Sequence, residues 1–172
     1  MSLTDTVLRY LQAQTEENFL AVRAEIASAP GFSPYANFEA EALVLVEQRE
    51  FEKALAALKA MMPGGFLSPG LHDLLARIHD LMNNEEGARN ETYLALAALN
   101  GILATGDGSD ARPYLVLQIT DEYDVLKALG KVSSAQSLYQ LQGKVLDRHA
   151  CHDGNVLWFD ITLPRAETQP NA

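Results

Sequence analysis

The chain has 172 residues, of which 48% are hydrophobic, and its formal net charge is -10. This length fits one domain or two small ones, and this hydrophobic content predicts a packed core rather than a disordered chain. Lys and Arg side chains neutralise phosphates in nucleic-acid complexes, so an acidic chain without a basic run argues against binding to DNA or RNA. The single cysteine, Cys151, excludes a disulfide within the chain.

Nothing in the sequence points to a membrane or to export. The N-terminus lacks a basic segment followed by a long apolar run, so we expect no signal peptide. The longest apolar runs, such as Ala40–Val46, are far shorter than the ~20 residues that span a bilayer. We therefore expect a reduced, cytoplasmic protein that does not enter a membrane.

Residues 1–103 are predicted to be helical, because apolar residues recur there at a spacing of three or four. Two Ser-Pro pairs predict helix starts, since serine caps a helix and proline suits its first turn. The expected helices begin near Ser2, Thr15, Ser33, Phe51, Ser68 and Glu85. In the last of them, Tyr93 and Leu96 are expected to face the core.

Two of the expected helix pairs are spaced like tetratricopeptide repeats. Pro34 and Pro69 are 35 positions apart, and Ala54 and Ala88 are 34 apart. These spacings match the ~34-residue period of that repeat, in which small residues allow the helices of a hairpin to cross closely. The full consensus is absent, so we predict tetratricopeptide-like helical hairpins rather than a true repeat array.

Residues 104–164 are predicted to form a small, mostly antiparallel sheet with one short helix, sharing a core with the helical part. The expected strands are 114–119, 135–141, 144–151 and 156–163, and the expected helix runs from Thr120 to Gly130. Between strands, Asp153-Gly154 predicts a type I′ turn, and Gln142-Gly143 marks another turn. Residues 165–172 are expected to be a disordered tail. The predicted fold class is α+β.

Five short segments support a family resemblance. They are Phe32–Tyr35, Gly106–Gly108, Glu122–Leu126, Gln136–Leu138 and Phe159–Ile161. Through them the chain resembles a family of uncharacterised bacterial proteins, a domain of unknown function in which tetratricopeptide-like helices precede a small α/β part. The resemblance implies that fold, and it implies no activity, cofactor or ligand. Many members carry an export signal, which we do not find here.

One acidic segment with candidate functional residues is Gly106–Asp110. Asp107 and Asp110, with small residues between them, could bind a hard cation through oxygen ligands. The alternative is structural: the glycines permit a tight link, and Asp107 hydrogen-bonds backbone amides in an Asx turn.

A second acidic segment is Thr120–Asp124. Asp121 and Asp124 are three apart and therefore share a helix face, and paired carboxylates can perform acid–base chemistry. The alternative is an acidic first turn that favours the helix N-terminus, with Tyr123 packed inward. Within this segment we take Glu122, Tyr123 and Asp124 as the first candidates for a site.

The histidines are not expected to bind a metal, and no cofactor is expected. His149, Cys151 and His152 lie close in sequence, but they form an incomplete ligand set for zinc. His72 and His79 are expected on a solvated surface or groove.

Two functions stay open. The first is a non-catalytic interaction or scaffold protein whose partner is a protein or peptide, because helical hairpins make concave binding surfaces. The second is a small enzyme or ligand-binding protein with an acidic site near Asp107, Glu122 and Asp124. No catalytic constellation is complete in the sequence, which favours the first.

Overall fold

The computed structural model describes residues 2–37 and 39–163. The predicted tail at 165–172 lies outside the described residues. In the described part, helices occupy the N-terminal portion and a four-stranded mixed sheet closes the chain, which confirms the α+β class. The elements in chain order are α1 (Leu3–Gln12), α2 (Glu16–Ala27), α3 (Glu39–Glu47), α4 (Phe51–Lys59), α5 (Pro69–Leu81), α6 (Glu85–Ala104), β1 (Tyr114–Leu115), α7 (Ile119–Ala128), β2 (Ser133–Leu141), β3 (Lys144–Cys151) and β4 (Val156–Asp160).

Side-chain caps explain several of the helix starts. Ser2 forms a reciprocal capping box at α1, and Thr15 accepts a hydrogen bond from the amide of Asn18 at α2. The predicted start at Ser33-Pro34 is wrong, because α3 begins at Glu39. The carbonyl of Pro34 instead accepts a hydrogen bond from the amide of Ile119, so a tertiary contact to α7 holds this segment.

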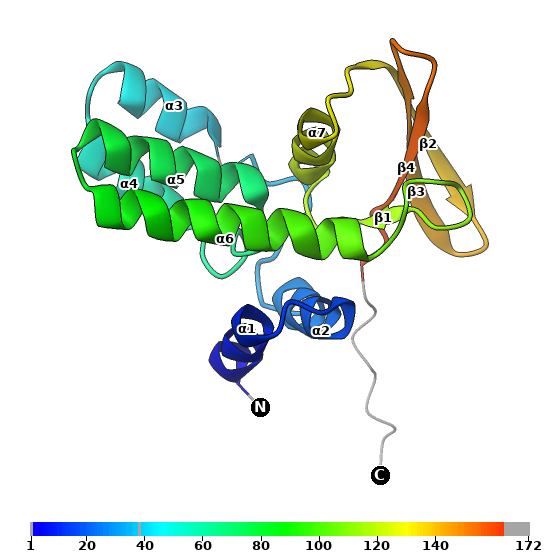
Figure 1. Ribbon diagram of the computed structural model, residues 1–172, viewed down its shortest axis with the longest axis horizontal. Helices are drawn as coiled ribbons and strands as arrows, with labels where there is room; N and C mark the ends of the chain where they lie inside the picture. Colours follow the sequence, from blue (N-terminus) through cyan, green and yellow to red (C-terminus); the bar gives the residue numbers. More distant parts are fainter. Residues whose placement is uncertain (1, 38, 164–172) are drawn as a thin grey trace.

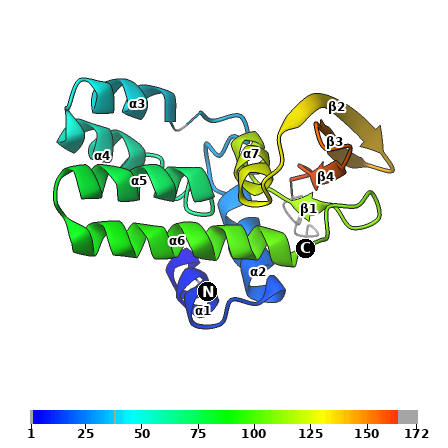
Figure 2. The same ribbon diagram turned by 45° about the horizontal axis from the view of Figure 1, so that its top comes forward.

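The helices form a layer beside the sheet. Figures 1 and 2 show α3, α4, α5 and α6 side by side, with α1 and α2 against the far side of α6. Helix α7 stands between this layer and the sheet. Ala54 and Ala88 are both buried. The tetratricopeptide-like packing itself stays a prediction.

A glycine lets the first hairpin lie against α6. A Cβ atom at Gly101 would stand 2.1 Å from Cδ2 of Phe19 and 2.5 Å from Oη of Tyr10. The Tyr10 hydroxyl donates to the carbonyl of Ala97, and burial raises its pKa to about 12. Tyr10 and Phe19 also meet edge to face, with ring centroids 5.7 Å apart.

The hydrophobic core continues from the helices into the sheet. One buried cluster joins residues of α1, α2, α6, α7, β1, β3 and β4, and a second one fills the space among α3, α4 and α5. The inward placement predicted for Tyr93 and Leu96 is wrong, since both are about half exposed. Helix α6 instead buries Ala88, Ala97, Ala98, Gly101 and Ile102. No helix in the described part of the chain is long and apolar enough to cross a membrane.

The sheet has the strand order β1-β4-β3-β2, with β1 parallel to β4 and the other pairs antiparallel. Positive φ at both Gln142 and Gly143 gives the type I′ turn between β2 and β3. The type I′ prediction for Asp153-Gly154 is wrong, because only Gly154 has positive φ. There Asp153 accepts from the amide of Asn155 and from Lys131, which shapes a longer turn.

Strand β1 is shorter than predicted. Only Tyr114 and Leu115 pair with β4 as a strand, although the sequence suggested 114–119. The amide of Val116 still bonds the carbonyl of Asp160, and the chain then turns into α7. This early turn places the first turn of α7 over the sheet.

Candidate functional site

One face of β3 carries three buried polar or polarisable side chains. Alternation along the strand places Asp147, His149 and Cys151 on the same side, and all three are buried. Strand pairing sets Gln136 of β2 beside His149 and Phe159 of β4 beside Asp147. This face is directed towards α7.

Helix α7 supplies the opposing carboxylate. Gln118 is the N-cap residue of the helix, and its backbone amide donates to Oδ2 of Asp121 at 2.9 Å. The predicted start at Thr120 is therefore wrong by about one residue, since Thr120 lies inside the helix. Because the helix begins at Ile119, the side chain of Glu122 points at the sheet, where it is fully buried.

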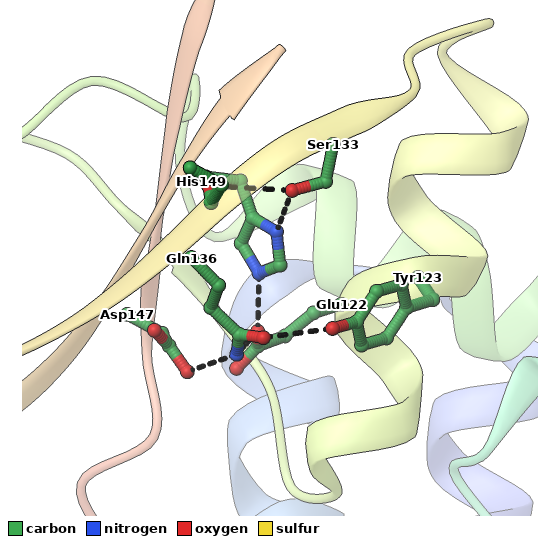
Figure 3. Close-up of polar contacts among 7 residues, drawn as sticks. Glu122, Tyr123, Ser133, Gln136, Asp147 and His149 are labelled. Atoms are coloured by element: carbon green, nitrogen blue, oxygen red, sulfur yellow. Dashed lines mark hydrogen bonds and ion pairs between the residues drawn. The ribbon is translucent and has the colours of Figure 1, made fainter.

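The centre of the site is a buried pair. Oε2 of Glu122 lies 2.7 Å from Nε2 of His149, and both side chains are 0% exposed. Asp147 completes a group in which one ligand atom from each residue lies within 4.8 Å of the others. Figure 3 shows the two carboxylates converging below the imidazole.

Hydrogen bonds and rings hold the imidazole in place. Its Nδ1 lies 2.9 Å from Oγ of Ser133, so both ring nitrogens of His149 are engaged. The ring also meets Tyr123 and Phe159 edge to face, each at a centroid distance of 5.4 Å. The prediction that Tyr123 packs inward is wrong, because its side chain is about half exposed and covers His149 from outside.

An exposed amide covers the carboxylates. Nε2 of Gln136 donates to Oδ2 of Asp147 at 2.6 Å and lies 3.5 Å from Oε2 of Glu122. The hydroxyl of Tyr123 donates to Oε1 of Gln136 at 2.7 Å. Gln136 and Tyr123 therefore form the outer cover of the site, on β2 and α7 (Figure 3).

The carboxylates of Glu122 and Asp147 each have one oxygen without a hydrogen-bond partner. Oε1 of Glu122 and Oδ1 of Asp147 are buried and have no hydrogen-bond partner among the described residues. In that part of the chain, no lysine or arginine pairs with either carboxylate. Burial is the main reason that the pKa of Glu122 is raised, and nearby Asp147 raises it further, whereas the bond to His149 lowers it. Buried charges without partners are costly, so a proton or a cation that neutralised this group would lower its free energy.

The other acidic candidates lie in different surroundings. Oδ1 of Asp107 accepts from the amide of Ser109, which is the Asx turn of the structural alternative, and Asp110 is exposed. Asp124 accepts from the amide of Gly70 at the start of α5. Burial, as the largest cause, raises the pKa of Asp124 to about 6. The buried group of Glu122, Asp147 and His149 includes none of these three.

The placement predicted for His72 and His79 is wrong, because both side chains are buried. His72 lies between a carboxylate oxygen of Glu91, at 2.6 Å, and the carbonyl of Phe66, at 2.9 Å. Ring nitrogen Nδ1 of His79 lies 3.1 Å from the side-chain nitrogen Nδ2 of Asn84, the residue that caps α6. The polar residues around His72 and His79 in the sequence suggest a solvated face of α5, but neighbouring helices cover these two side chains.

Sequence reasoning identified Glu122 and Tyr123 and missed Asp147, His149 and Gln136 as their partners. The available signal was the Asp-x-His alternation on a strand, which puts both side chains on one face. Cys151 shares that face but is outside the group, and His152 is exposed. The three residues weighed for zinc therefore do not converge in the described structure.

Comparisons of the chain with protein-family models, with curated proteins and with solved structures find no match. The resemblance to an uncharacterised bacterial family stays a prediction.

Proposed function

We propose that this protein binds one divalent first-row transition-metal ion through Glu122, Asp147 and His149. The observation that carries this proposal is the buried group of two carboxylates and one imidazole, in which Oε1 of Glu122 and Oδ1 of Asp147 have no hydrogen-bond partner among the described residues. Two carboxylates and a neutral imidazole carry a charge of -2, which a divalent cation neutralises.

The donor types select the class of metal. Calcium and magnesium take oxygen ligands, whereas imidazole nitrogen suits zinc, iron, cobalt and, with carboxylates, manganese. Carboxylate and imidazole together are common ligands of zinc. A thiolate-preferring ion is disfavoured, since Cys151 is outside the group.

Metal binding requires Nε2 of His149 to be free of a proton. Nε2 of His149 shares a hydrogen bond with Glu122, and the ion would take the place of that proton, while the neutral imidazole would carry its one proton on Nδ1 and donate it to Oγ of Ser133. Ser133 stays on Nδ1 and fixes the ring orientation, as outer partners of metal-bound histidines commonly do. Because the metal competes with protons for these donors, we expect its affinity to fall in acid.

Gln136 offers a fourth donor. A half-turn of its carboxamide would direct Oε1, rather than Nε2, towards Asp147 and Glu122. The amide group would then donate to the hydroxyl of Tyr123, which can accept as well as donate. Four protein donors make a closed site, the arrangement of structural rather than catalytic metals.

Burial also favours a structural role for the metal. Glu122 and His149 are 0% exposed and Asp147 is 4% exposed, so a substrate has no direct access to the ion. The donors come from α7, β2 and β3, and one ion would tie these elements together. This role agrees with a non-catalytic interaction or scaffold protein, which we retain as the wider proposal. Two segments of the family resemblance, Glu122–Leu126 and Gln136–Leu138, meet at this site.

The test starts from protein purified without a histidine tag and stripped with a chelator. We expect zinc, manganese or cobalt to bind at one ion per chain, measured by elemental analysis after gel filtration. At a free metal concentration of 100 times the Kd, the free energy of unfolding should rise by about 2.7 kcal/mol, which is a rise in Tm of about 5–11 °C for a chain of this size.

Variants separate the site from weak surface binding. Glu122→Gln and Asp147→Asn should each abolish the metal-dependent rise in Tm, whereas the exposed carboxylate change Asp110→Asn should leave it intact. The proposal fails if the stripped wild type shows no stoichiometric metal and no change in Tm with any of the three ions.

A further inference from the structure

A groove lies where α7 stands beside the N-terminal end of α5 and the C-terminal half of α6 (Figures 1 and 2). Its volume is about 300 Å³, and none of the residues of the candidate metal site lines it. Ligand pockets commonly measure about 300–1,000 Å³, so this groove suits a small chemical group. Most of its lining is apolar, and the apolar residues are Pro69, Ala95, Leu96, Leu99 and Ala128.

The apolar wall of the groove belongs to the outer face of α6. Leu96 is 53% exposed and Leu99 is half-buried. Helix α6 turns smaller side chains, Ala97 and Ala98, towards the core instead. A hydrocarbon chain laid on this wall would leave water together with the side chain of Leu96, which is favourable. Because Leu96 is exposed, a side chain of another molecule can reach the groove from solvent.

Two carboxylates meet at one end of the groove. A Cβ atom at Gly70 would stand 2.7 Å from Oε1 of Glu39 and 2.8 Å from Oδ2 of Asp124. Because both oxygens lie so close to one point, a single cationic group can contact both of them at hydrogen-bond distance. Glu39 belongs to α3 and Asp124 to α7, so the packing of separate helices brings the two carboxylates together at the start of α5.

The negative charge at this end of the groove is only partly balanced. The amide of Gly70 donates to Oδ2 of Asp124 at 2.8 Å. Lys127 lies nearby, but its ion pair is with Asp73, at 3.9 Å. In the described part of the chain, no ion pair joins Glu39 or Asp124 to a basic side chain. Burial is the largest cause of the raised pKa of Asp124, and the charge of Glu39 adds to it, so an added cation would stabilise this end.

The arrangement favours an ammonium group over a metal ion or a guanidinium group. Within the described residues, the one group of three closely spaced metal-binding atoms is that of the candidate metal site. A lysine ammonium donates three hydrogen bonds in different directions and can serve two carboxylates on separate helices. The fork of a guanidinium group instead matches a single carboxylate. The alkyl stem of a lysine also packs readily along an apolar wall.

We propose that this groove binds a lysine in a basic segment of a partner protein. The lysine stem lies against Leu96 and Leu99, and its ammonium group lies between Glu39 and Asp124. The net charge of -10 attracts such a segment. This inference rests on the wider proposal of an interaction protein and is separate from the metal site, whose elemental analysis can succeed or fail without affecting it. A short peptide in this groove buries far less than the roughly 1,200 Å² of a stable interface, so we expect a Kd of roughly 0.1–1 mM.

The first test titrates the isotope-labelled full chain with the peptide acetyl-Ser-Leu-Lys-Leu-Ser-amide and follows the backbone amides by NMR. We expect saturable shifts at Gly70, Leu96 and Ala128, which line the groove. A peptide with norleucine in place of lysine keeps the stem and loses the charge, so its Kd should be about tenfold higher or more. A peptide with arginine in that place should bind about threefold more weakly or worse, because its fork does not match two separate carboxylates.

The second test uses variants of the groove with the lysine peptide. Glu39→Gln and Asp124→Asn should each raise the Kd about threefold or more, because each removes one charge from the ammonium contact. Asp110→Asn, which changes an exposed carboxylate outside the groove, should leave the Kd unchanged. Leu96→Ser should also weaken binding, whereas Leu81→Ser should not, since Leu81 is 54% exposed and lies at the other end of α5.

Several results would overturn the proposal. One is the absence of saturable shifts at Gly70, Leu96 and Ala128 up to about 5 mM lysine peptide, well above the expected Kd. Equal binding of the norleucine or arginine peptide, or an unchanged Kd in both Glu39→Gln and Asp124→Asn, would also contradict it. Calcium chloride that shifts the same amides at lower concentration would show a metal site instead. Shifts that grow with protein concentration alone would show that a second copy occupies the groove.

Discussion

Neutralising Asp147 should stabilise the metal-free protein and remove its response to metal. The change Asp147→Asn keeps the shape of the side chain and an oxygen that accepts from Gln136. The oxygen that loses its charge, Oδ1, has no partner in the described wild-type chain, so no hydrogen bond is lost there. The variant thus removes a buried charge that lies close to the carboxylate of Glu122.

The magnitude follows from the separation of the carboxylates. Their ligand oxygens lie within 4.8 Å, where two unit charges repel by about 3 kcal/mol at an effective dielectric constant of ~20. The bond from Gln136 weakens by about 1 kcal/mol when its acceptor loses its charge. We expect a net gain of about 1–2 kcal/mol, equivalent to a rise in Tm of about 2–8 °C.

The assay compares urea and thermal unfolding of wild type and variant, first in chelator and then with a stoichiometric excess of zinc or manganese. In chelator the variant should be more stable. With metal the order should reverse, because only the wild type gains binding free energy. Asp110→Asn serves as the control for the loss of an exposed carboxylate.

One result would refute this reasoning. If Asp147→Asn lowers the stability of metal-free protein by more than about 1 kcal/mol, the carboxylate is a needed hydrogen-bond acceptor and not an under-satisfied ligand. A metal response that survives in the variant would likewise remove Asp147 from the ligand set.

Three further changes test the fold around the site. Gly101→Ala should cost about 1–3 kcal/mol in urea unfolding, because its Cβ would overlap two aromatic side chains, whereas the exposed neighbour change Asn100→Ala should not destabilise α6; equal stability of the two variants would contradict the close approach of α1 and α2. Ala54→Leu and Ala88→Leu should each lower stability by about 1–3 kcal/mol through overpacking, and a Tm within a degree of wild type for both would remove the helix-crossing argument. Burial is the largest cause that raises the pKa of Asp121 from 3.8 to about 7, so the folded state binds this proton more tightly than the unfolded state and the protein loses stability as the pH rises from about 4 to 7. Asp121→Asn should flatten that decline in thermal melts made in chelator. An unchanged pH profile would show that the aspartate is ionised in the folded protein.

Local patterns predicted many of the helices and strands. Periodic apolar residues and capping side chains act within a few positions of the chain, so the starts of α1 and α2 follow from the sequence near Ser2 and Thr15. The signal failed where a distant contact decided the conformation. Ser33-Pro34 has the composition of a helix start, but the Pro34 carbonyl binds α7. His72 and His79 look like members of a polar stripe until neighbouring helices cover them.

In the candidate site, too, some features follow from local sequence and others from contacts between distant segments. Local pattern alone predicts that Glu122 lies in the first turn of a short helix, and the alternation of a strand implies that Asp147 and His149 share one of its faces. Packing between distant segments brings this helix over that face and places Gln136 of β2 beside Asp147 and Glu122. The buried charge and the partnerless oxygens arise from that packing, since burial depends on contacts between segments about 25 residues apart.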